Sequence, residues 1–495
     1  MSERKWKVIY GEYIGLEKRA LNLINATVFD FYNDYLPFYS ADEVSEDLLK
    51  SNNLIIVGRY ENNKLIRECI DSGELVAPDC AQGYSIEVKD SKWSKEHQTV
   101  FICGADECGV MYGAVDFANK YCGYIIYKSG KGSMEYAAYF DAPFKEKLPE
   151  WKAKSSPSVE TRAIWTWGHC IYDYRTFFEN MVMLKLNEIV IWNDYAPINA
   201  SEVVDYAHAL GIKVVWGFAW GWGTDCNVSM GLDEESMRKL KNEIVERYER
   251  EYASSGADGI YFQSCTELNQ EYIGEKLIAE VVVDFVNDTA GELFERHPGL
   301  HVQFGLHSNS VKHRLEYIAK VDPRVMIVWE NCGVFPFDSN KVDHGYECDF
   351  EPVEKTVDFV ERISTLRSDD ELFGVVLKGV CTLDWSNFTH QEKNIILGEK
   401  SKSFIKKRSE VKHHILRFRQ TPWLRYPDHV AKVIRALVKR RNTNTVEIVV
   451  EDAIFENEIP ISVAVYAETL WNCNRDGADI VSDASKFPCV KFANI

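Results

Sequence analysis

The feature that most constrains the fold is a short apolar segment that recurs along the chain from residue 161 onward. Most copies are rich in Val, Ile and Trp, and most are followed by a stretch in which apolar residues recur with helical spacing. Continuous apolar strands that alternate with helices are typical of parallel sheets covered on both faces. Seven such segments are found at residues 161–168, 188–194, 212–217, 256–269, 301–307, 325–331 and 374–380.

An eighth strand is expected at residues 462–467, where the sequence Ser-Val-Ala-Val-Tyr-Ala is apolar, after a helical insertion near 391–441. Eight strand–helix units that close on themselves form a (β/α)8 TIM barrel, whose reactive groups lie at the C-terminal ends of the strands. We therefore predict the α/β class, with a catalytic barrel over residues 158–495. The expected helices are residues 174–184, 201–210, 236–252 and 276–296.

Residues 1–150 predict a separate, small and non-catalytic α/β domain. Apolar runs at 53–58 and 99–104 and a period-two segment at 83–88 indicate strands, and residues 109–118 have helical spacing. The spacing of a P-loop or of a dinucleotide-binding GxGxxG motif is absent from this sequence, so we expect no nucleotide site. A polar connection with Pro149 and Pro157 marks the boundary to the barrel.

Charge and composition exclude several classes of partner. The chain has 495 residues and a formal net charge of −19, which would repel nucleic acid and anionic membrane surfaces. We expect a cytoplasmic protein, because the N-terminus lacks an apolar leader and no stretch is apolar enough to span a bilayer. Thirteen cysteines without close CxxC pairs indicate reduced thiols. The sequence leaves the oligomeric state open, a homo-oligomer included.

Carboxylates at the predicted strand ends indicate a hydrolytic site. They are Asp194, Asp225, Glu267, Glu330, Asp384 and Glu468. Glycoside hydrolysis requires two carboxyl groups, one as the acid and one as the nucleophile or base. Glu267 is the expected acid, because desolvation at the end of an apolar strand raises the pKa of a carboxyl group. Glu330 and Asp384 compete for the second role, although a structural hydrogen-bonding role fits each of them equally well.

Aromatic and polar residues near the same strand ends predict a carbohydrate pocket. Nine tryptophans are found there: Trp165, Trp167, Trp192, Trp216, Trp220, Trp222, Trp329, Trp385 and Trp471. An indole offers a flat apolar face that suits the C–H face of a sugar ring. Any one of them alone fits the core better than a pocket, and the concentration of nine on one predicted face favours the pocket. Further candidates for substrate binding are Arg162, Asp194, His307 and Glu468, and Arg162 could instead pair internally. The histidine spacing fits no metal site, and we expect no cofactor.

Several motifs resemble a known group of enzymes. The sequence Lys185-Leu186-Asn187 before the second strand and the segment Leu470-Trp471-Asn472 are similar to signatures of family 20 β-N-acetylhexosaminidases, and residues 54–58, 83–86 and 109–114 are similar to the domain that precedes such barrels. The chain thus resembles these glycoside hydrolases, together with related α-glucuronidases and O-GlcNAc hydrolases. The resemblance implies a barrel glycosidase in which Glu267 is the acid and Arg162 holds sugar hydroxyls.

One departure from the family pattern affects the mechanism. Family 20 enzymes place an adjacent Asp-Glu pair at the end of strand four, whereas this chain has Thr266-Glu267. The missing aspartate puts acetamido-assisted catalysis in doubt and favours a two-carboxylate mechanism. The leading hypothesis is an exo-acting glycosidase that removes a terminal sugar from an oligosaccharide. The alternatives are an inactive sugar-binding barrel, an α-glucuronidase-like two-carboxylate glycosidase, or an enzyme of another type on the same fold.

Overall fold

The computed structural model divides the chain into two compact units. One comprises Met1–Pro157 with the short segments Ala209–Gly211 and Lys486–Cys489, and the other comprises the remaining residues. The structure describes residues 6–32, 34–123, 147–166, 170–193, 195–218, 220, 234–264, 266, 268, 270–332, 353–380, 391, 393–440, 444–450, 452–487 and 490–492.

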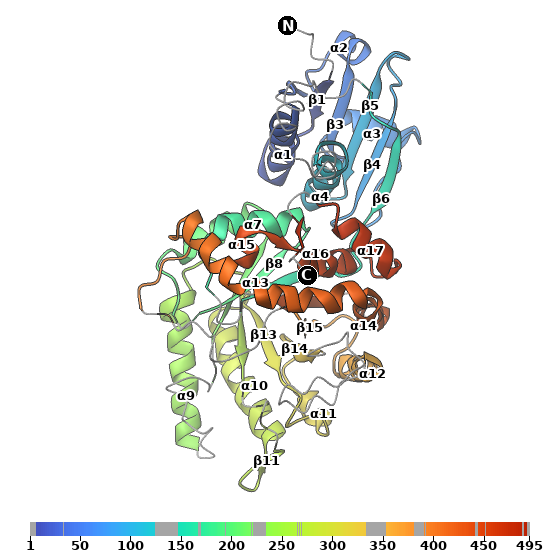
Figure 1. Ribbon diagram of the computed structural model, residues 1–495. Coiled ribbons are helices and arrows are strands. Elements are labelled where there is room, and N and C mark those ends of the chain that lie inside the picture. The colour runs from blue at the N-terminus through green and yellow to red at the C-terminus, as the bar shows by residue number, and fades with distance from the viewer. Residues whose placement is uncertain are drawn as a thin grey trace. The chain divides into compact units, whose positions relative to one another are not determined.

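The N-terminal unit is a six-stranded sheet with helices, in the strand order β2-β1-β3-β5-β4-β6 (Figure 1). Strand β4 runs antiparallel to both of its neighbours, and the other pairs are parallel. The strands are β1 (Trp6–Tyr10), β2 (Phe38–Ser40), β3 (Asn53–Arg59), β4 (Tyr84–Asp90), β5 (Gln98–Gly104) and β6 (Trp151–Ser155). The helices are α1 (Gly15–Tyr32), α2 (Glu46–Ser51), α3 (Lys64–Asp71), α4 (Glu107–Ala118) and η1 (Asn119–Gly123).

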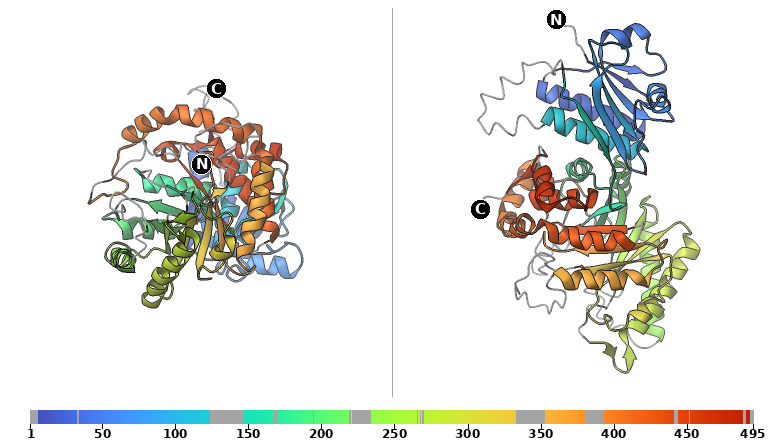
Figure 2. Two further views of the ribbon diagram at one scale, coloured as in Figure 1. Left: turned by 90° about the horizontal axis from the view of Figure 1, so that it is seen from below. Right: turned by 90° about the vertical axis from the view of Figure 1, so that its right-hand side faces the viewer.

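The second unit is built on a closed barrel of eight parallel strands, in the order β10-β13-β14-β15-β16-β7-β8-β9. Helices ring the strands, as the left view of Figure 2 shows. The barrel strands are β7 (Thr161–Trp165), β8 (Glu188–Trp192), β9 (Lys213–Gly217), β10 (Gly259–Gln263), β13 (His301–Leu306), β14 (Val325–Cys332), β15 (Phe373–Leu377) and β16 (Asn444–Val449). The predicted fold, a TIM barrel preceded by a small α/β domain, is confirmed.

Helices and short strands connect the barrel strands and extend beyond them. The four helices predicted from the sequence correspond, in chain order, to α7, α8, α9 with η2, and α10. The helical elements of this unit are α7 (Tyr174–Met183), α8 (Ala200–His208), α9 (Glu234–Arg247), η2 (Tyr248–Tyr252), α10 (Ile278–Arg296), α11 (Leu315–Ile318), α12 (Val353–Ile363), η4 (Ser364–Leu366), α13 (Lys402–Arg425), α14 (Pro427–Arg440), α15 (Ile454–Asn457), α16 (Ile461–Trp471) and α17 (Gly477–Ala484). The short strands are β11 (Tyr272–Ile273), β12 (Lys276–Leu277), β17 (Ile459–Pro460) and β18 (Val490–Lys491).

The prediction of the eighth strand at residues 462–467 is wrong. These residues lie in α16, whose eleven residues are all buried. A helix that is apolar all round cannot be told from a buried strand by periodicity alone. The eighth strand is β16, which follows α13 and α14 and closes the barrel against β7. Its central Glu447 interrupts the apolar run by which the other strands were recognised.

In the described ranges, every helix is too short or too polar to cross a lipid bilayer. The described free cysteines include Cys69, Cys103, Cys170 and Cys473, all of them buried.

Candidate active site

The strand register decides which side chains enter the barrel. Paired residues on neighbouring parallel strands point to the same face of a sheet. Trp165 of β7 pairs with Val190 of β8 and with Val449 of β16, so all three face the interior. The interior cluster comprises Trp165, Val190, Trp192, Val215, Tyr261, Met326, Val328, Val376 and Val449. Alternation then places the next polar residues, among them Gln263 and Glu330, at the C-terminal end of the same interior.

Glu330 is the centre of a hydrogen-bonded cluster at this end of the barrel. Its side chain has no exposed surface. Oε1 accepts hydrogen bonds from the hydroxyl of Tyr261 at 2.7 Å and from Nε2 of Gln263 at 2.8 Å. Oε2 lies 2.8 Å from the same Gln263 nitrogen and 2.6 Å from Nε2 of His307. Three side chains from two neighbouring strand ends therefore hold one carboxylate.

The neighbours of Glu330 keep it ionised. Burial alone would raise the pKa of its carboxyl group, but the charge and hydrogen bond of His307, the charge of Lys378 and the hydroxyl of Tyr261 outweigh burial and lower the pKa to about 2. Glu330 is therefore an anion at neutral pH. A fixed anion suits the nucleophile or base of a hydrolase rather than its general acid.

His307 links this cluster to the loop that follows β10. The backbone N–H of His307 donates to Oγ1 of Thr266 at 3.1 Å, and Ser310 donates to the carbonyl of Thr266 through both its N–H and its hydroxyl. Thr266 has no exposed surface, whereas the His307 side chain is 19% exposed. His307 thus presents the solvent-accessible edge of the cluster. The buried Thr266 has a structural role and offers no carboxylate to a substrate.

Two of the predicted tryptophans meet in the same interior. Trp165 and Trp192 pack edge to face with ring centroids 6.4 Å apart, and both contact Tyr261. The ammonium of Lys378 lies 5.0 Å from the centroid of Trp165, a cation–π arrangement. Trp192 retains 8% exposure while Trp165 has none. Of the two, only Trp192 offers any surface to a ligand in this state.

Two further buried acids lie inside the barrel, and neither was predicted from the sequence. Glu447 of β16 and Glu188 of β8 each pair with Ala163 of β7, so they face the interior at one level. Burial, together with the nearby charges of Glu188 and Glu330, raises the pKa of Glu447 well above its usual range. Burial raises the pKa of Glu188 to about 7, although Gln303 donates a hydrogen bond to it at 3.0 Å. Both could have been recognised in the sequence, because each is a glutamate within an otherwise apolar strand.

Three other predicted pocket tryptophans face the helices instead, which corrects their assignment. Trp216 donates a hydrogen bond through Nε1 to Ser255 at 3.1 Å. The ring of Trp220 stacks on that of Phe262 with centroids 3.7 Å apart, and the rings of Trp329 and Phe359 have centroids 4.7 Å apart. All three are buried. Strand alternation is the reason for Trp216 and Trp329, since each flanks an inward residue and must therefore point outward. These indoles are core residues of the strand–helix interface.

Arg162, Trp471 and Glu468 lie at the opposite end of the barrel, which also corrects their assignment. The Arg162 guanidinium is fully buried and donates to the carbonyls of Val159, Glu160 and Lys185, all of which precede a strand. It stacks on Trp471, whose ring also lies 4.7 Å from the ammonium of Lys185. Glu468 is 3.7 Å from that ammonium. Trp471 and Glu468 belong to the last turn of α16 rather than to a strand, and their contacts with Arg162 and Lys185 place them near the N-terminal ends of β7 and β8.

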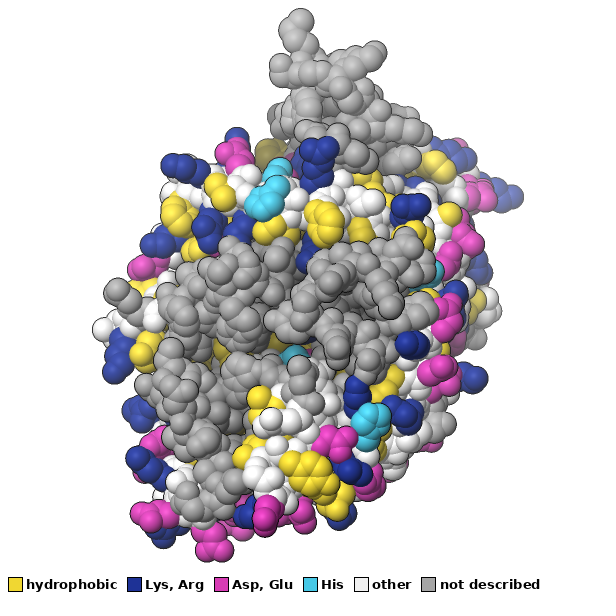
Figure 3. All heavy atoms as spheres, turned by 60° about the horizontal axis from the view of Figure 1, so that its bottom comes forward, with side chains coloured by type: hydrophobic (Ala, Val, Ile, Leu, Met, Phe, Trp, Pro, Cys, Tyr) yellow, Lys and Arg dark blue, Asp and Glu magenta, His cyan; other side chains and the backbone are white. Residues whose placement is uncertain are grey.

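Several predicted site residues lie outside the described residues. They are Glu267, Asp384, Trp167, Asp194 and Trp385, together with Asp225 and Trp222. Within the part of the chain that the structure describes, no group of three or more His, Cys, Asp or Glu side chains is placed to hold a metal ion. In the face shown in Figure 3, acidic and basic side chains are interspersed over the described surface.

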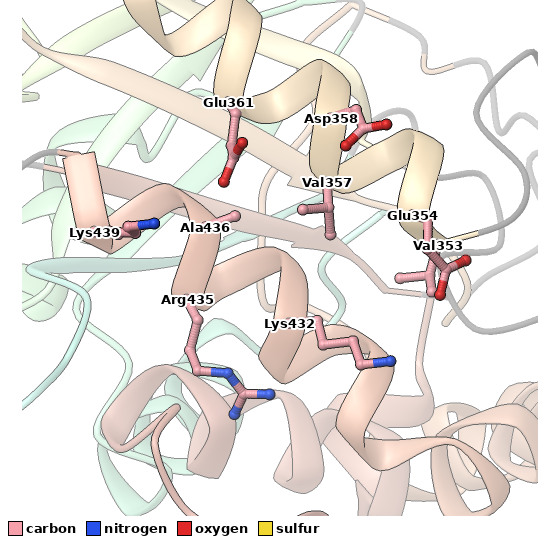
Figure 4. A pocket seen from close by; sticks show the side chains of 9 residues that line it. All are labelled: Val353, Glu354, Val357, Asp358, Glu361, Lys432, Arg435, Ala436 and Lys439. Atoms are coloured by element: carbon pink, nitrogen blue, oxygen red, sulfur yellow. The ribbon is translucent and has the colours of Figure 1, made fainter.

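A groove of about 410 Å³ lies away from these groups, between α12 and α14 on the outside of the barrel (Figure 4). Acidic residues of α12, such as Asp358, line one side, and basic residues of α14, such as Lys432, line the other. It contains none of the residues that converge on Glu330. We therefore place the candidate active site at the C-terminal end of the barrel strands.

Comparison with known proteins bears on the fold. No protein-family model matches the sequence, and no curated protein does. Solved structures of glycoside hydrolases do share the fold. A mutant Streptomyces plicatus beta-hexosaminidase in complex with its product GlcNAc aligns with a TM-score of 0.52 at 9% identity, over 98% of this chain and 91% of that chain. The family 20 beta-N-acetylhexosaminidase of Streptomyces coelicolor gives 0.52 at 9% identity, over 97% and 91%.

A family 138 glycoside hydrolase that targets the pectin rhamnogalacturonan II aligns with a TM-score of 0.50 at 10% identity, over 96% of this chain. This chain spans 64% of that enzyme's length, less than two thirds. The similarity establishes that the chain has the fold of these glycoside hydrolases. The predicted resemblance to family 20 enzymes and their relatives is confirmed at that level.

Proposed function

We propose that this protein is an exo-acting glycoside hydrolase that removes a terminal sugar at the C-terminal end of its barrel. The observation that carries the proposal is the fully buried Glu330 carboxylate, which strand-end side chains hold within a fold shared with glycoside hydrolases. Two of those side chains, Tyr261 and Gln263, belong to β10, the strand that leads to Glu267.

In this proposal two carboxyl groups share the reaction. Glu267 protonates the glycosidic oxygen as the leaving group departs. The anionic Glu330 either attacks the anomeric carbon or takes a proton from the attacking water. Because Glu330 has no exposed surface, we propose that the substrate approaches Oε2 from the side of His307, the neighbour with an exposed edge. Asp384 is the alternative to Glu330 in this role.

The position before Glu267 argues against acetamido assistance. In that mechanism a carboxylate beside the acid steadies the substrate acetamido group. Here Thr266 is buried, and its hydroxyl accepts a hydrogen bond from the backbone of His307. We therefore favour a two-carboxylate mechanism, of the kind considered for the α-glucuronidase-like alternative, over a hexosaminidase mechanism. Trp192 and His307 are the described residues that we propose contact the sugar, with Asp194, Trp167 and Trp385 as further candidates.

The proposal is tested with Glu267→Gln and Glu330→Gln on a panel of aryl glycosides. Loss of a general acid lowers turnover by roughly 100- to 10,000-fold. We expect Glu267→Gln to be less impaired on dinitrophenyl glycosides, whose leaving group needs no proton. Glu330→Gln should lose activity on every substrate. Glu280→Gln, an exposed change on α10, is the matched control. Undiminished turnover by Glu267→Gln would remove that residue from the acid role.

A sugar-binding barrel without catalysis is the second candidate function, and the structural use of Thr266 favours it. Calorimetry with monosaccharides distinguishes the two functions. Binding without any hydrolysis after days of incubation would favour the binding protein.

A further inference from the structure

The carboxylate of Glu330 crosses one strand of the barrel to reach its partners. Glu330 belongs to β14, whereas Tyr261 and Gln263 belong to β10, and β13 lies between these two strands. The residue of β13 in the path is Gly305, which pairs with Gln263 on one side and with Val328 on the other. The side chain of Glu330 therefore passes over a position at which β13 has no side chain.

The space over Gly305 is already filled by the cluster. A methyl group at this position would overlap Oε1 of Glu330 and the hydroxyl of Tyr261, and would lie 2.7 Å from Cζ of the tyrosine ring. The backbone does not demand glycine there, because Gly305 is not among the residues with positive φ. Steric room is therefore the reason that the structure gives for a glycine at this position.

We propose that Gly305 is a positioning residue: the gap that it leaves in β13 lets the Glu330 carboxylate reach β10. The inference rests on the role proposed for Glu330. It adds that the location of this carboxylate relative to the strand leading to Glu267 is set by the missing side chain on β13. Any larger residue would push Glu330 back toward β14 and separate it from Tyr261 and Gln263.

The first test is the kinetics of Gly305→Ala. A displacement of about 1 Å in a catalytic group can lower the rate by roughly 100-fold. We expect a loss of that order in kcat, with KM changing much less, because the substitution moves Glu330 rather than a binding surface. Gly374→Ala is the matched control, since Gly374 is another barrel-strand glycine and a methyl group there would meet Thr445 and Val328 at 3.2–3.3 Å. Wild-type kcat in Gly305→Ala would overturn the proposal.

The second test does not depend on activity. Thermal midpoints are measured for Gly305→Ala in the wild-type and in the Glu330→Ala background, where Tyr261 can move into the vacated space. We expect Gly305→Ala to lower the thermal midpoint in the Glu330→Ala background by less than half of the decrease that it causes in the wild type. An equal loss in both would show that Gly305 does not act through Glu330. If the wild type cleaves no glycoside, the proposed function fails while this comparison still decides the packing of Gly305.

A shorter carboxylate covers the case in which Gly305→Ala does not fold. Adding Glu330→Asp to Gly305→Ala should then restore soluble, folded protein, because the shorter side chain leaves room for the new methyl group. Adding Glu330→Asp to Gly374→Ala, in contrast, should not increase the yield of folded protein. Failure of Glu330→Asp to restore folding would contradict the proposed crossing.

Discussion

The charge of Glu330 makes a measurable contribution to stability, and Glu330→Gln removes it. The pKa of this carboxyl group is about 2 in the folded protein and 4.5 in its usual state. Each unit of difference corresponds to about 1.4 kcal/mol, so the ionised group stabilises the fold by about 3 kcal/mol. No discount for solvent screening applies, because the side chain has no exposed surface. Glutamine has nearly the same shape as glutamate. Its NH₂ group, however, would face an N–H donor of Gln263 or His307, so one hydrogen bond to the carboxylate would be lost.

The sign of this effect fixes its pH dependence. A group whose pKa is lower in the folded state stabilises the protein above its unfolded pKa, and the stabilisation is lost as pH falls toward the folded pKa. We therefore expect Glu330→Gln to be less stable than the wild type by about 3 kcal/mol at pH 7, and the difference to shrink between pH 4.5 and pH 2.

The assay is urea unfolding followed by circular dichroism at a series of pH values, with the exposed Glu280→Gln as the control. Glu280→Gln should track the wild type throughout. A difference between wild type and Glu330→Gln that stays constant from pH 7 to pH 3 would refute the reasoning, because it would show that packing rather than charge is lost.

Four other substitutions test the remaining assignments. Burial raises the pKa of Glu188 to about 7, so wild-type stability falls as pH rises from 4.5 to 7. Glu188→Gln still accepts a hydrogen bond from Gln303 and should be more stable than the wild type by about 3 kcal/mol above pH 7. A difference in the free energy of unfolding in urea that does not change with pH would contradict this. Trp329→Ala should cost about 3–5 kcal/mol in unfolding without changing KM, whereas Trp192→Ala should raise KM; the reverse pattern would place Trp329 in the pocket. Arg162→Lys should lower the thermal midpoint and leave KM unchanged, and a large rise in KM would restore Arg162 to substrate binding.

Local sequence determined the strands and most helices of the barrel. Runs such as residues 189–192 and 325–329 carry apolar side chains on both faces, as strands covered on both sides do. The same local signal failed at α16, because a helix buried on every side and a buried strand have the same apolar composition. It failed again at β16, where Glu447 interrupts the run.

The site was only partly predictable. The sequence placed Glu330 and His307 at strand ends, and the contact between them confirms that they are neighbours. It did not reveal that Tyr261, Gln263 and Gly305 form the surroundings of Glu330, since the strands that carry them come together only when the barrel closes.

Orientation was the other property that only the tertiary structure decided. Trp216 and Trp329 have the same local sequence character as Trp165 and Trp192, yet the first two face helices and the last two face the interior. Chain composition fixes which segments become strands, because burial depends on residue type. The strand register fixes which side chains meet, because alternate residues of a strand point to opposite faces and their partners belong to strands that are distant in the sequence.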